Sequence, residues 1–288
     1  IARVFHVQLP SCRSRPVTIT ATLALQYTAI CAVLGVTMTT VESIWHWRRG
    51  NFGETGIWPW YILREDHNPL ASAVLTPALD GAGLLALLLA RLAAAILVPV
   101  CYGAGLNAGL PLLILFVSQF LLAWRTRLGN EGGDQMTNIM LIMSFLPQAL
   151  PNEPAIANLA ALFVGAQILL SYIASGGAKL FGPKWQRGEA LADIMNQFQY
   201  GNYWLMRQLR AHPFVCRLIC FSVILFQLSF PLFFLLPAPY AYIYIAGGVA
   251  FHFGIAYFMR LYLFVLTFLG TYPCLIFARE AFRSYVGL

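Results

Sequence analysis

The feature that most constrains this chain is a series of apolar runs of membrane-spanning length, which recur from residue 17 to residue 277. A helix needs roughly 20 apolar residues to cross the hydrocarbon core of a bilayer. The runs leave no stretch long enough for a separate soluble domain, and only 10% of the 288 residues are charged, against roughly 25% in an ordinary soluble domain. We therefore expect residues 1–288 to form one all-α, polytopic helical bundle in a lipid bilayer.

The hydropathy pattern predicts about eight transmembrane helices. They fall at about residues 17–42, 82–100, 109–124, 135–150, 155–178, 214–236, 239–258 and 260–278. A short tail (1–16), an interfacial loop (43–77) and an amphipathic segment (188–212) lie outside them. Because a spanning helix must cross completely to satisfy its backbone, successive loops alternate sides. The loops after the first, third and fifth spans are therefore expected to share one face.

The charged residues exclude one class of function. There are 18 basic and 11 acidic residues, a net charge of +7, but the basic ones sit in short segments between helices. Contact with anionic headgroups and a role as topology signals explain them there, so we expect no binding to nucleic acid. The six cysteines form no CxxC pair, and we expect no metal site.

The sequence leaves the orientation in the membrane open. The basic residues of the shared face favour the cytoplasmic side for that face by the positive-inside rule. The basic N-terminus favours the reverse orientation, with the N-terminus inside, if several of those residues belong to a site. We expect a bacterial cytoplasmic membrane, because the sequence shows no eukaryotic targeting or retention signal.

Lys179 is the first candidate for chemistry. The chain has only two lysines, and both lie in the short segment from Ala178 to Trp185. Gln167, Ser171, Ser175 and Lys179 follow each other at i, i+4 spacing, which predicts a polar stripe facing the bundle interior. A buried lysine can serve as a general base. Alternatively, Lys179 marks the helix end, where its charge complements the terminal carbonyls.

Asp134 and Gln135 form the second candidate, at the start of the span predicted at 135–150. A carboxylate there accepts hydrogen bonds from unpaired backbone N–H groups, so helix capping explains Asp134 without any function. In the functional interpretation, both side chains point into the same cavity as Lys179.

Two further ionisable residues lie within apolar runs. His252 is flanked by Phe251 and Phe253, and an intramembrane histidine is either held in an interhelical hydrogen bond or functional. Arg91 is central in its span and needs a partner, for which Asp193, Glu189 and a bound anionic ligand are equal candidates.

The loop at 43–77 is rich in tryptophan. It contains Trp45, Trp47, Trp58 and Trp60, with Arg48 and Arg49 among them. Aromatic and basic residues at a membrane boundary usually form an interfacial belt. The alternative is a lid over the face that holds Lys179.

Several segments resemble one family in order along the chain. The segment Ser171-Tyr172-Ile173-Ala174-Ser175-Gly176-Gly177-Ala178-Lys179-Leu180, followed by Trp185 and Gly188-Glu189-Ala190, is similar to the signature of the HTTM domain. That multi-span domain occurs in vitamin K-dependent gamma-carboxylases and in many bacterial membrane proteins. Gly133-Asp134-Gln135, Phe226-Gln227-Leu228-Ser229-Phe230-Pro231 and the blocks at 251–264 and 270–273 resemble further motifs of the family.

The resemblance implies a lysine that acts as a base toward a reduced quinone, and Lys179 aligns with it. The carboxylases carry a histidine near the position of Asp134, where this chain has none, and they bind their peptide substrate with a large non-membrane region that is not found before Leu288. We therefore do not expect glutamate carboxylation.

Two functions compete at this point. The first is a quinone-linked, carboxylase-like enzyme. Its catalytic residues would be Lys179, Asp134 and His252, and its substrate-binding residues Gln135, Ser175, Trp185 and Arg91. The second is a non-catalytic subunit that packs its apolar helices against other membrane proteins.

Overall fold

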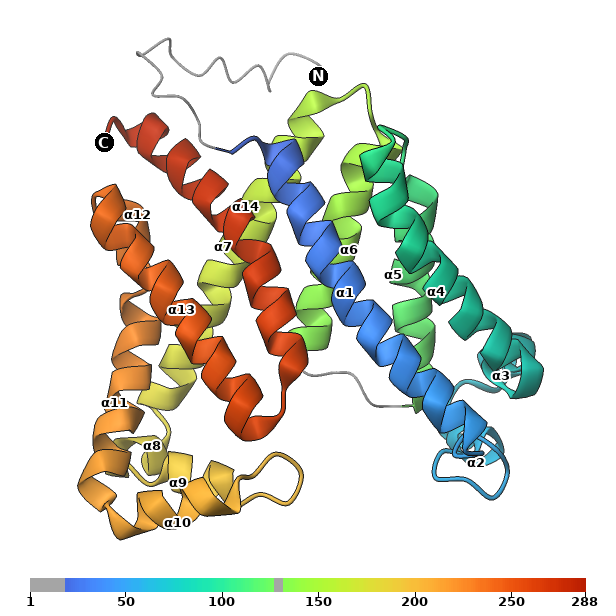
Figure 1. The fold of residues 1–288 in the computed structure, drawn as a ribbon, viewed down its shortest axis with the longest axis horizontal. Helices are drawn as coiled ribbons and strands as arrows, with labels where there is room; N and C mark the ends of the chain where they lie inside the picture. Colours follow the sequence, from blue (N-terminus) through green and yellow to red (C-terminus); the bar gives the residue numbers. More distant parts are fainter. Residues whose placement is uncertain (1–18, 127–131) are drawn as a thin grey trace.

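The computed structural model describes residues 19–126 and 132–288, and all regular structure in these two ranges is helical. The predicted fold class is thereby confirmed, while the predicted tail (1–16) lies outside the described residues. Figure 1 shows the long helices side by side. In chain order they are α1 (Ala21–Arg48), α4 (Gly81–Gly103), α5 (Gly109–Thr126), α6 (Gly132–Ala149), α7 (Pro154–Leu180), α11 (Pro213–Ser229), α13 (Ala238–Met259) and α14 (Tyr262–Val286).

Within the described residues, six helices are long and apolar enough to cross a membrane, and a seventh span results if α10 (Tyr203–Ala211) and α11 count as one. The expected number of about eight is thus reduced to six or seven. The predicted span at 135–150 corresponds to α6, whose first turns carry Asp134, Gln135 and Asn138 and are too polar. The predicted span at 214–236 is broken, because α11 ends at Ser229 after 17 residues. The short helix α12 (Leu232–Leu235) follows it.

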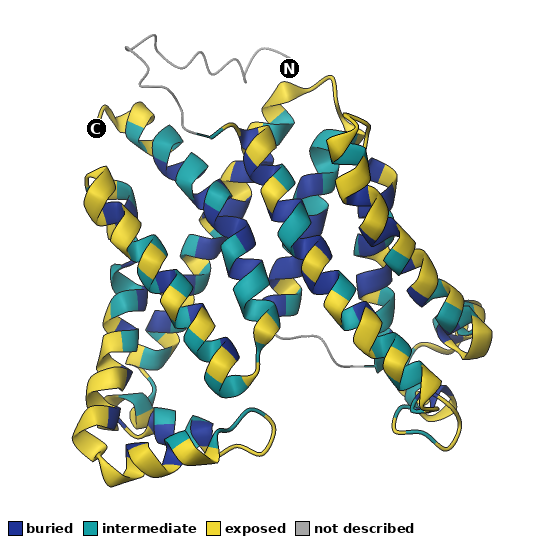
Figure 2. Cartoon of the chain, in the orientation of Figure 1, coloured by how far each residue is buried: buried dark blue, intermediate teal, exposed yellow. Residues whose placement is uncertain are grey.

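The centre of the bundle is formed by α1, α7 and α14. In Figure 2 the buried residues line the inner faces of the long helices, whereas exposed residues face outward. Ala24, Ala29 and Ala32 of α1 have no exposed surface. In a bilayer, helices associate mainly through close van der Waals packing, which small residues permit. The helix α6 contacts α1, α5, α7 and α14, and in its first turn Gly133 is buried whereas Gln135 is exposed.

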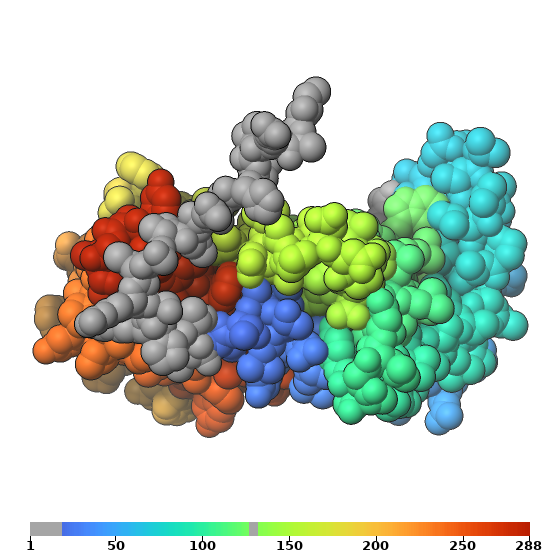
Figure 3. Space-filling view, turned by 90° about the horizontal axis from the view of Figure 1, so that it is seen from above, coloured from blue at the N-terminus to red at the C-terminus, as the bar shows by residue number. Residues whose placement is uncertain are grey.

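The connecting helices occupy one end of the bundle. At this end lie α2 (Trp60–Leu63), the 3-10 helix η1 (Arg64–Asp66), α3 (Pro69–Leu79), α8 (Pro183–Arg187), α9 (Ala190–Met195) and α10. The α4–α5 and α6–α7 connections and the C-terminus lie at the opposite end (Figure 1). The two loops expected on one face, 43–77 and 179–189, therefore do share it. Seen from the C-terminal end, the bundle is elongated, with α13 and α14 on one side and α4 on the other (Figure 3).

The Trp-rich segment is a folded unit held by one buried arginine. Arg125 of α5 has no exposed surface. Its Nε donates to the carbonyl of Leu79 at 2.7 Å, and its Nη1 and Nη2 donate to the carbonyls of Trp58 at 3.1 Å and Phe52 at 3.3 Å. The guanidinium also lies over the Phe52 ring, 4.7 Å from its centroid. Arg125 thus ties a long connection to the end of α5.

Candidate functional site

A cavity of about 420 Å³ with many polar side chains in its lining lies at the end of the bundle that carries the connecting helices. A second cavity of about 180 Å³ shares Thr39, Glu42 and Asp134 with it. The lining of the first comprises Thr39, Glu42, Ser43 and His46 of α1, Arg91 of α4, Gln119, Leu122, Ala123 and Thr126 of α5, Asp134 of α6, Leu263 of α14, and Phe52, Trp58, Tyr200 and Leu261 of connecting segments.

Arg91 is the buried cation of this cavity. Its side chain is 1% exposed, and its partners are neutral oxygens. Nε donates to Thr40 Oγ1 at 2.8 Å, and Nη1 donates to Ser118 Oγ at 3.2 Å. Nη2 donates to Thr39 Oγ1 at 3.4 Å and also to Gln119 Oε1. No carboxylate within the described ranges forms a hydrogen bond with the guanidinium. Its charge is therefore stabilised by the dipoles of these neutral hydroxyl and amide groups.

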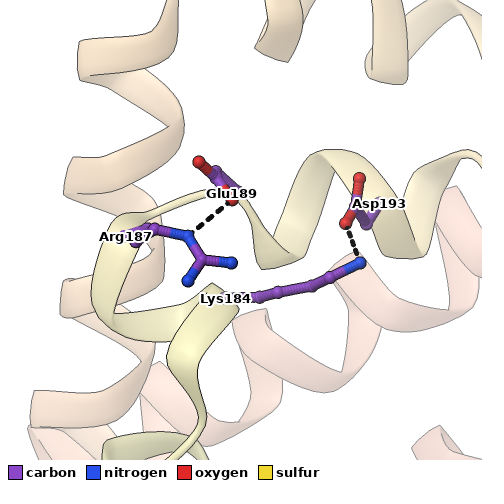
Figure 4. A network of polar contacts seen from close by, with 4 residues as sticks. All are labelled: Lys184, Arg187, Glu189 and Asp193. Atoms are coloured by element: carbon purple, nitrogen blue, oxygen red, sulfur yellow. Dashed lines mark hydrogen bonds and ion pairs between the residues drawn. The ribbon is translucent and has the colours of Figure 1, made fainter.

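The expected ion-pair partners of Arg91 are engaged elsewhere. Asp193 accepts from Lys184 at 2.5 Å, and Glu189 accepts from Arg187 at 3.0 Å, on the surface formed by α8 and α9 (Figure 4). Two of the three partners considered for Arg91 are therefore excluded, and a bound anionic or polar ligand is the one that stays open.

Carboxylates lie beside the arginine without neutralising it by direct contact. Asp134 Oδ1 accepts from Gln119 Nε2 at 3.4 Å, and the same Gln119 accepts from Arg91 through its oxygen. Gln119 therefore bridges the guanidinium of Arg91 and the carboxylate of Asp134 by hydrogen bonds. Asp134 lies in the first turn of α6, where a helix dipole favours negative charge. Glu42 adds a second carboxylate to the lining, with its oxygen 4.0 Å from His46 Nε2. The cavity thus offers hydrogen-bond donors and acceptors together.

Lys179 forms a separate, local cluster. Its Nζ donates to Ser175 Oγ at 2.5 Å and to the Ser175 carbonyl at 3.3 Å. The ammonium also lies 5.3 Å from the centroid of the Trp185 ring. Neither Lys179 nor Gln135, which is exposed, belongs to the lining of the two cavities around Asp134. These cavities therefore do not bring Lys179 and Asp134 together, and the position of Lys179 in the last turn of α7 fits a helix-end role.

His252 belongs to a third cluster, which joins three helices. The hydroxyl of Tyr172 on α7 lies 3.0 Å from His252 Nε2 on α13 and 2.9 Å from the Tyr272 hydroxyl on α14. The imidazole stacks on Phe268 with the ring centroids 3.8 Å apart. Gly248 leaves the space for these hydroxyls, because a Cβ there would lie 2.2 Å from Tyr272 Oη. This is the interhelical hydrogen bond considered from the sequence.

The substitution Tyr172→Phe tests how much this cluster contributes to the stability of the protein. The substitution removes the hydroxyl that contacts both His252 and Tyr272. We expect the free energy of unfolding in detergent to fall by about 1–2 kcal/mol, because two buried polar groups lose their shared partner. Tyr257→Phe, on an exposed side chain of α13, is the matched control and should leave it unchanged. Equal unfolding midpoints for the two variants would show that the network contributes no stability.

Several cavity residues were missed by reasoning from the sequence. The pairs Thr39-Thr40 and Ser118-Gln119 lie inside apolar runs. Since polar side chains in a membrane segment usually face the bundle interior, these pairs were the available signal for the partners of Arg91. Glu42 was not singled out, because it is the last residue of the predicted first span. Within the described residues, no group of three or more His, Cys, Asp or Glu side chains is placed to hold a metal ion.

Comparison with known proteins assigns the chain to no family. No protein family model, no curated protein and no solved structure matches the chain. The helices alone define its class, which is that of multi-pass helical membrane proteins.

Proposed function

We propose that this membrane protein binds the polar head of a lipid-soluble molecule in the cavity at Arg91, and that a reduced quinone is the first ligand to test. The observation that supports the proposal is a cavity of about 420 Å³ lined by a buried guanidinium. A buried charge without a paired carboxylate is costly, and an anionic or hydrogen-bonding ligand would offset that cost.

The polar groups of the cavity suit a hydroquinone head. Each hydroxyl of such a head both donates and accepts a hydrogen bond. Asp134 and Glu42 supply acceptors, and Arg91 supplies donors. Four N–H groups of Arg91 have partners among the described residues, which leaves the second N–H of Nη1 for a ligand. The aromatic side chains of Phe52 and Trp58 provide the apolar contact that a ring requires.

In its enzymatic form, the proposal assigns proton transfer to a carboxylate of the cavity. Asp134 would accept the proton of a bound hydroquinone hydroxyl, and Arg91 would stabilise the oxygen anion that is left. The last turn of α7, which carries Lys179, lies at the same end of the bundle (Figure 1), and Lys179 is the base that the resemblance to the HTTM domain implies. Its hydrogen bonds to Ser175 would have to open before it could reach a ligand.

The test is a titration of the detergent-solubilised chain with menadione and with its reduced form, followed by tryptophan fluorescence. Trp58 lines the cavity, so a bound naphthoquinone ring should quench its emission. We expect Arg91→Gln to weaken binding at least tenfold, because a hydrogen bond to a charged group contributes about 1.5–3 kcal/mol.

The control is Arg64→Gln, which changes an exposed arginine at the same end of the bundle and should not alter binding. Trp58→Phe identifies the quenched residue. If Arg91→Gln binds as tightly as the unchanged chain, or if neither form of the ring quenches Trp58, the proposed ligand is wrong.

A second candidate function is a non-catalytic subunit of a larger membrane complex, and the surface of α13 favours it. In the most apolar 18-residue stretch of α13, only 17% of the residues are buried inside the protein, against 50% in the corresponding stretches of α1 and α14. Tyr240, Tyr242 and Tyr257 are exposed on it. Native mass spectrometry of the protein extracted from its own membrane separates the two functions. A lone chain with a quinone-sized mass supports ligand binding, whereas an assembly of fixed stoichiometry without such a mass supports the subunit.

A further inference from the structure

The helix α10 runs across the end of the bundle instead of along it. The angle at the break between α10 and α11 is 109°, and in Figure 1 α10 lies beneath the ends of the long helices. Its inner face buries Met206 and Leu209 in a small apolar core shared with α9 and α11. Its outer face exposes Arg207 and Arg210. If the long helices cross the bilayer, α10 therefore lies near the plane of the membrane surface.

Large, mostly exposed aromatic side chains lie on this helix and on the residues that flank it. Trp204 is 64% exposed and Phe214 is 79% exposed, and Phe198 is fully exposed. Aromatic rings beside basic residues on an in-plane amphipathic helix are typical of segments that lie in the headgroup region. The aromatic groups indicate that this surface contacts the bilayer interface and not only water.

The charge of the surface is strongly positive. Residues 180–217 contain five basic and two acidic side chains. Both carboxylates are already paired, Asp193 with Lys184 and Glu189 with Arg187 (Figure 4). The hydrogen bond from Lys184, assisted by the charges of Arg210 and Arg187, lowers the pKa of the Asp193 carboxyl.

Three arginines stay available on this surface. Arg207, Arg210 and Arg217 are exposed, and the described part of the chain places no carboxylate within salt-bridge distance of them. The backbone of Arg217, at the start of α11, lies against Gly188, because a Cβ on that glycine would be 2.6 Å from Arg217 Cα. The N-terminal part of α11 therefore continues the basic surface of α8 and α10.

We propose that this surface, here called the basic platform and defined by Arg207, Arg210, Arg217 and Trp204, binds the phosphate headgroups of anionic phospholipids in the leaflet where it lies. The arginines match phosphate oxygens in charge and hydrogen-bonding geometry. Trp204 enters the interface beside the same headgroups. The platform is separate from the Arg91 cavity, and its function does not depend on the ligand proposed there.

The experiment uses the full chain in detergent micelles. The micelles also contain either phosphatidylglycerol or phosphatidylcholine with brominated acyl chains, whose bromine atoms quench the fluorescence of nearby tryptophan. The contribution of Trp204 among the seven tryptophans is the difference between the unchanged chain and Trp204→Phe. We expect half-maximal quenching of Trp204 at a much lower fraction of phosphatidylglycerol than of phosphatidylcholine. We expect about 0.5 M salt, roughly three times physiological ionic strength, to remove the preference.

Arg207→Gln combined with Arg210→Gln should weaken the binding of phosphatidylglycerol roughly twenty-five-fold, because each basic residue near an anionic surface contributes a factor of about five. The matched control combines Arg48→Gln with Arg64→Gln, two exposed arginines at the same end of the bundle, and should keep the preference. Equal quenching by the two lipids, a preference that resists salt, or equal losses in both variant pairs would overturn the proposal.

Discussion

Replacing Arg125 by Met is expected to lower the free energy of unfolding by about 3 kcal/mol or more, because three backbone carbonyls lose a charged donor at once. A hydrogen bond to a charged group contributes about 1.5–3 kcal/mol, and an orphaned buried acceptor costs about 1–3 kcal/mol. The relief of a buried charge offsets part of this loss. Met is unbranched and apolar like the stem of Arg, and the variant removes both the three donors and the guanidinium that lies over the Phe52 ring.

The measurement is thermal unfolding in detergent together with limited proteolysis. The carbonyls belong to Phe52, Trp58 and Leu79, so the segment between α1 and α4 should become the first site of cleavage. Arg64→Met changes an exposed arginine within that same segment and is the control. If both variants unfold at the same temperature and are cut equally slowly, Arg125 does not hold the segment in place.

Arg125 also shows where prediction from the sequence reached its limit. The helices are predictable because lipid provides no partner for backbone N–H and C=O groups, so each long apolar run must satisfy its own. The connection at 43–77 follows no such rule. Its carbonyls are bonded by a side chain from α5, which comes much later in the chain. Its tryptophans have different surroundings: Trp60 is buried, Trp45 is exposed, and Trp58 lines the Arg91 cavity.

The candidate site, like the fold, was only partly predictable from the sequence. The need of Arg91 for partners follows from its place within an apolar run, but their identity depends on which faces of α1 and α5 meet α4. The grouping of Lys179 with Asp134 rested on their shared end of the bundle. The start of α6 and the end of α7, which carry them, do lie at one end of the bundle (Figure 1), yet loop alternation fixes only the depth of a residue along the helices and not its lateral position. Lys179 consequently bonds Ser175 on its own helix, whereas Asp134 contacts Gln119.

The same dependence on lateral packing makes Gly165 of α7 the second position where we expect a large effect. A Cβ on Gly165 would lie 2.7 Å from the Cβ of Ala278 and 2.9 Å from the carbonyl oxygen of Cys274, both on α14. Gly165→Val therefore forces α7 and α14 apart, because neither a backbone carbonyl nor a short alanine can turn aside. Overpacking of this kind typically costs about 1–3 kcal/mol. We expect the upper end of that range, because this contact lies at the centre of the bundle.

Gly177→Val on the same helix is the matched control, since no atom beyond its chain neighbours and the adjoining backbone of α7 lies within 4 Å of the position of its Cβ. Both substitutions change intrinsic helix propensity equally, so their difference in unfolding midpoint reports packing alone. Helices in a bilayer gain no hydrophobic energy from meeting each other, and the close approach that small residues permit supplies much of their attraction. Equal midpoints for the two variants would mean that α7 and α14 can separate at Gly165 without cost, and that the contact at the bundle centre does not hold the two helices together.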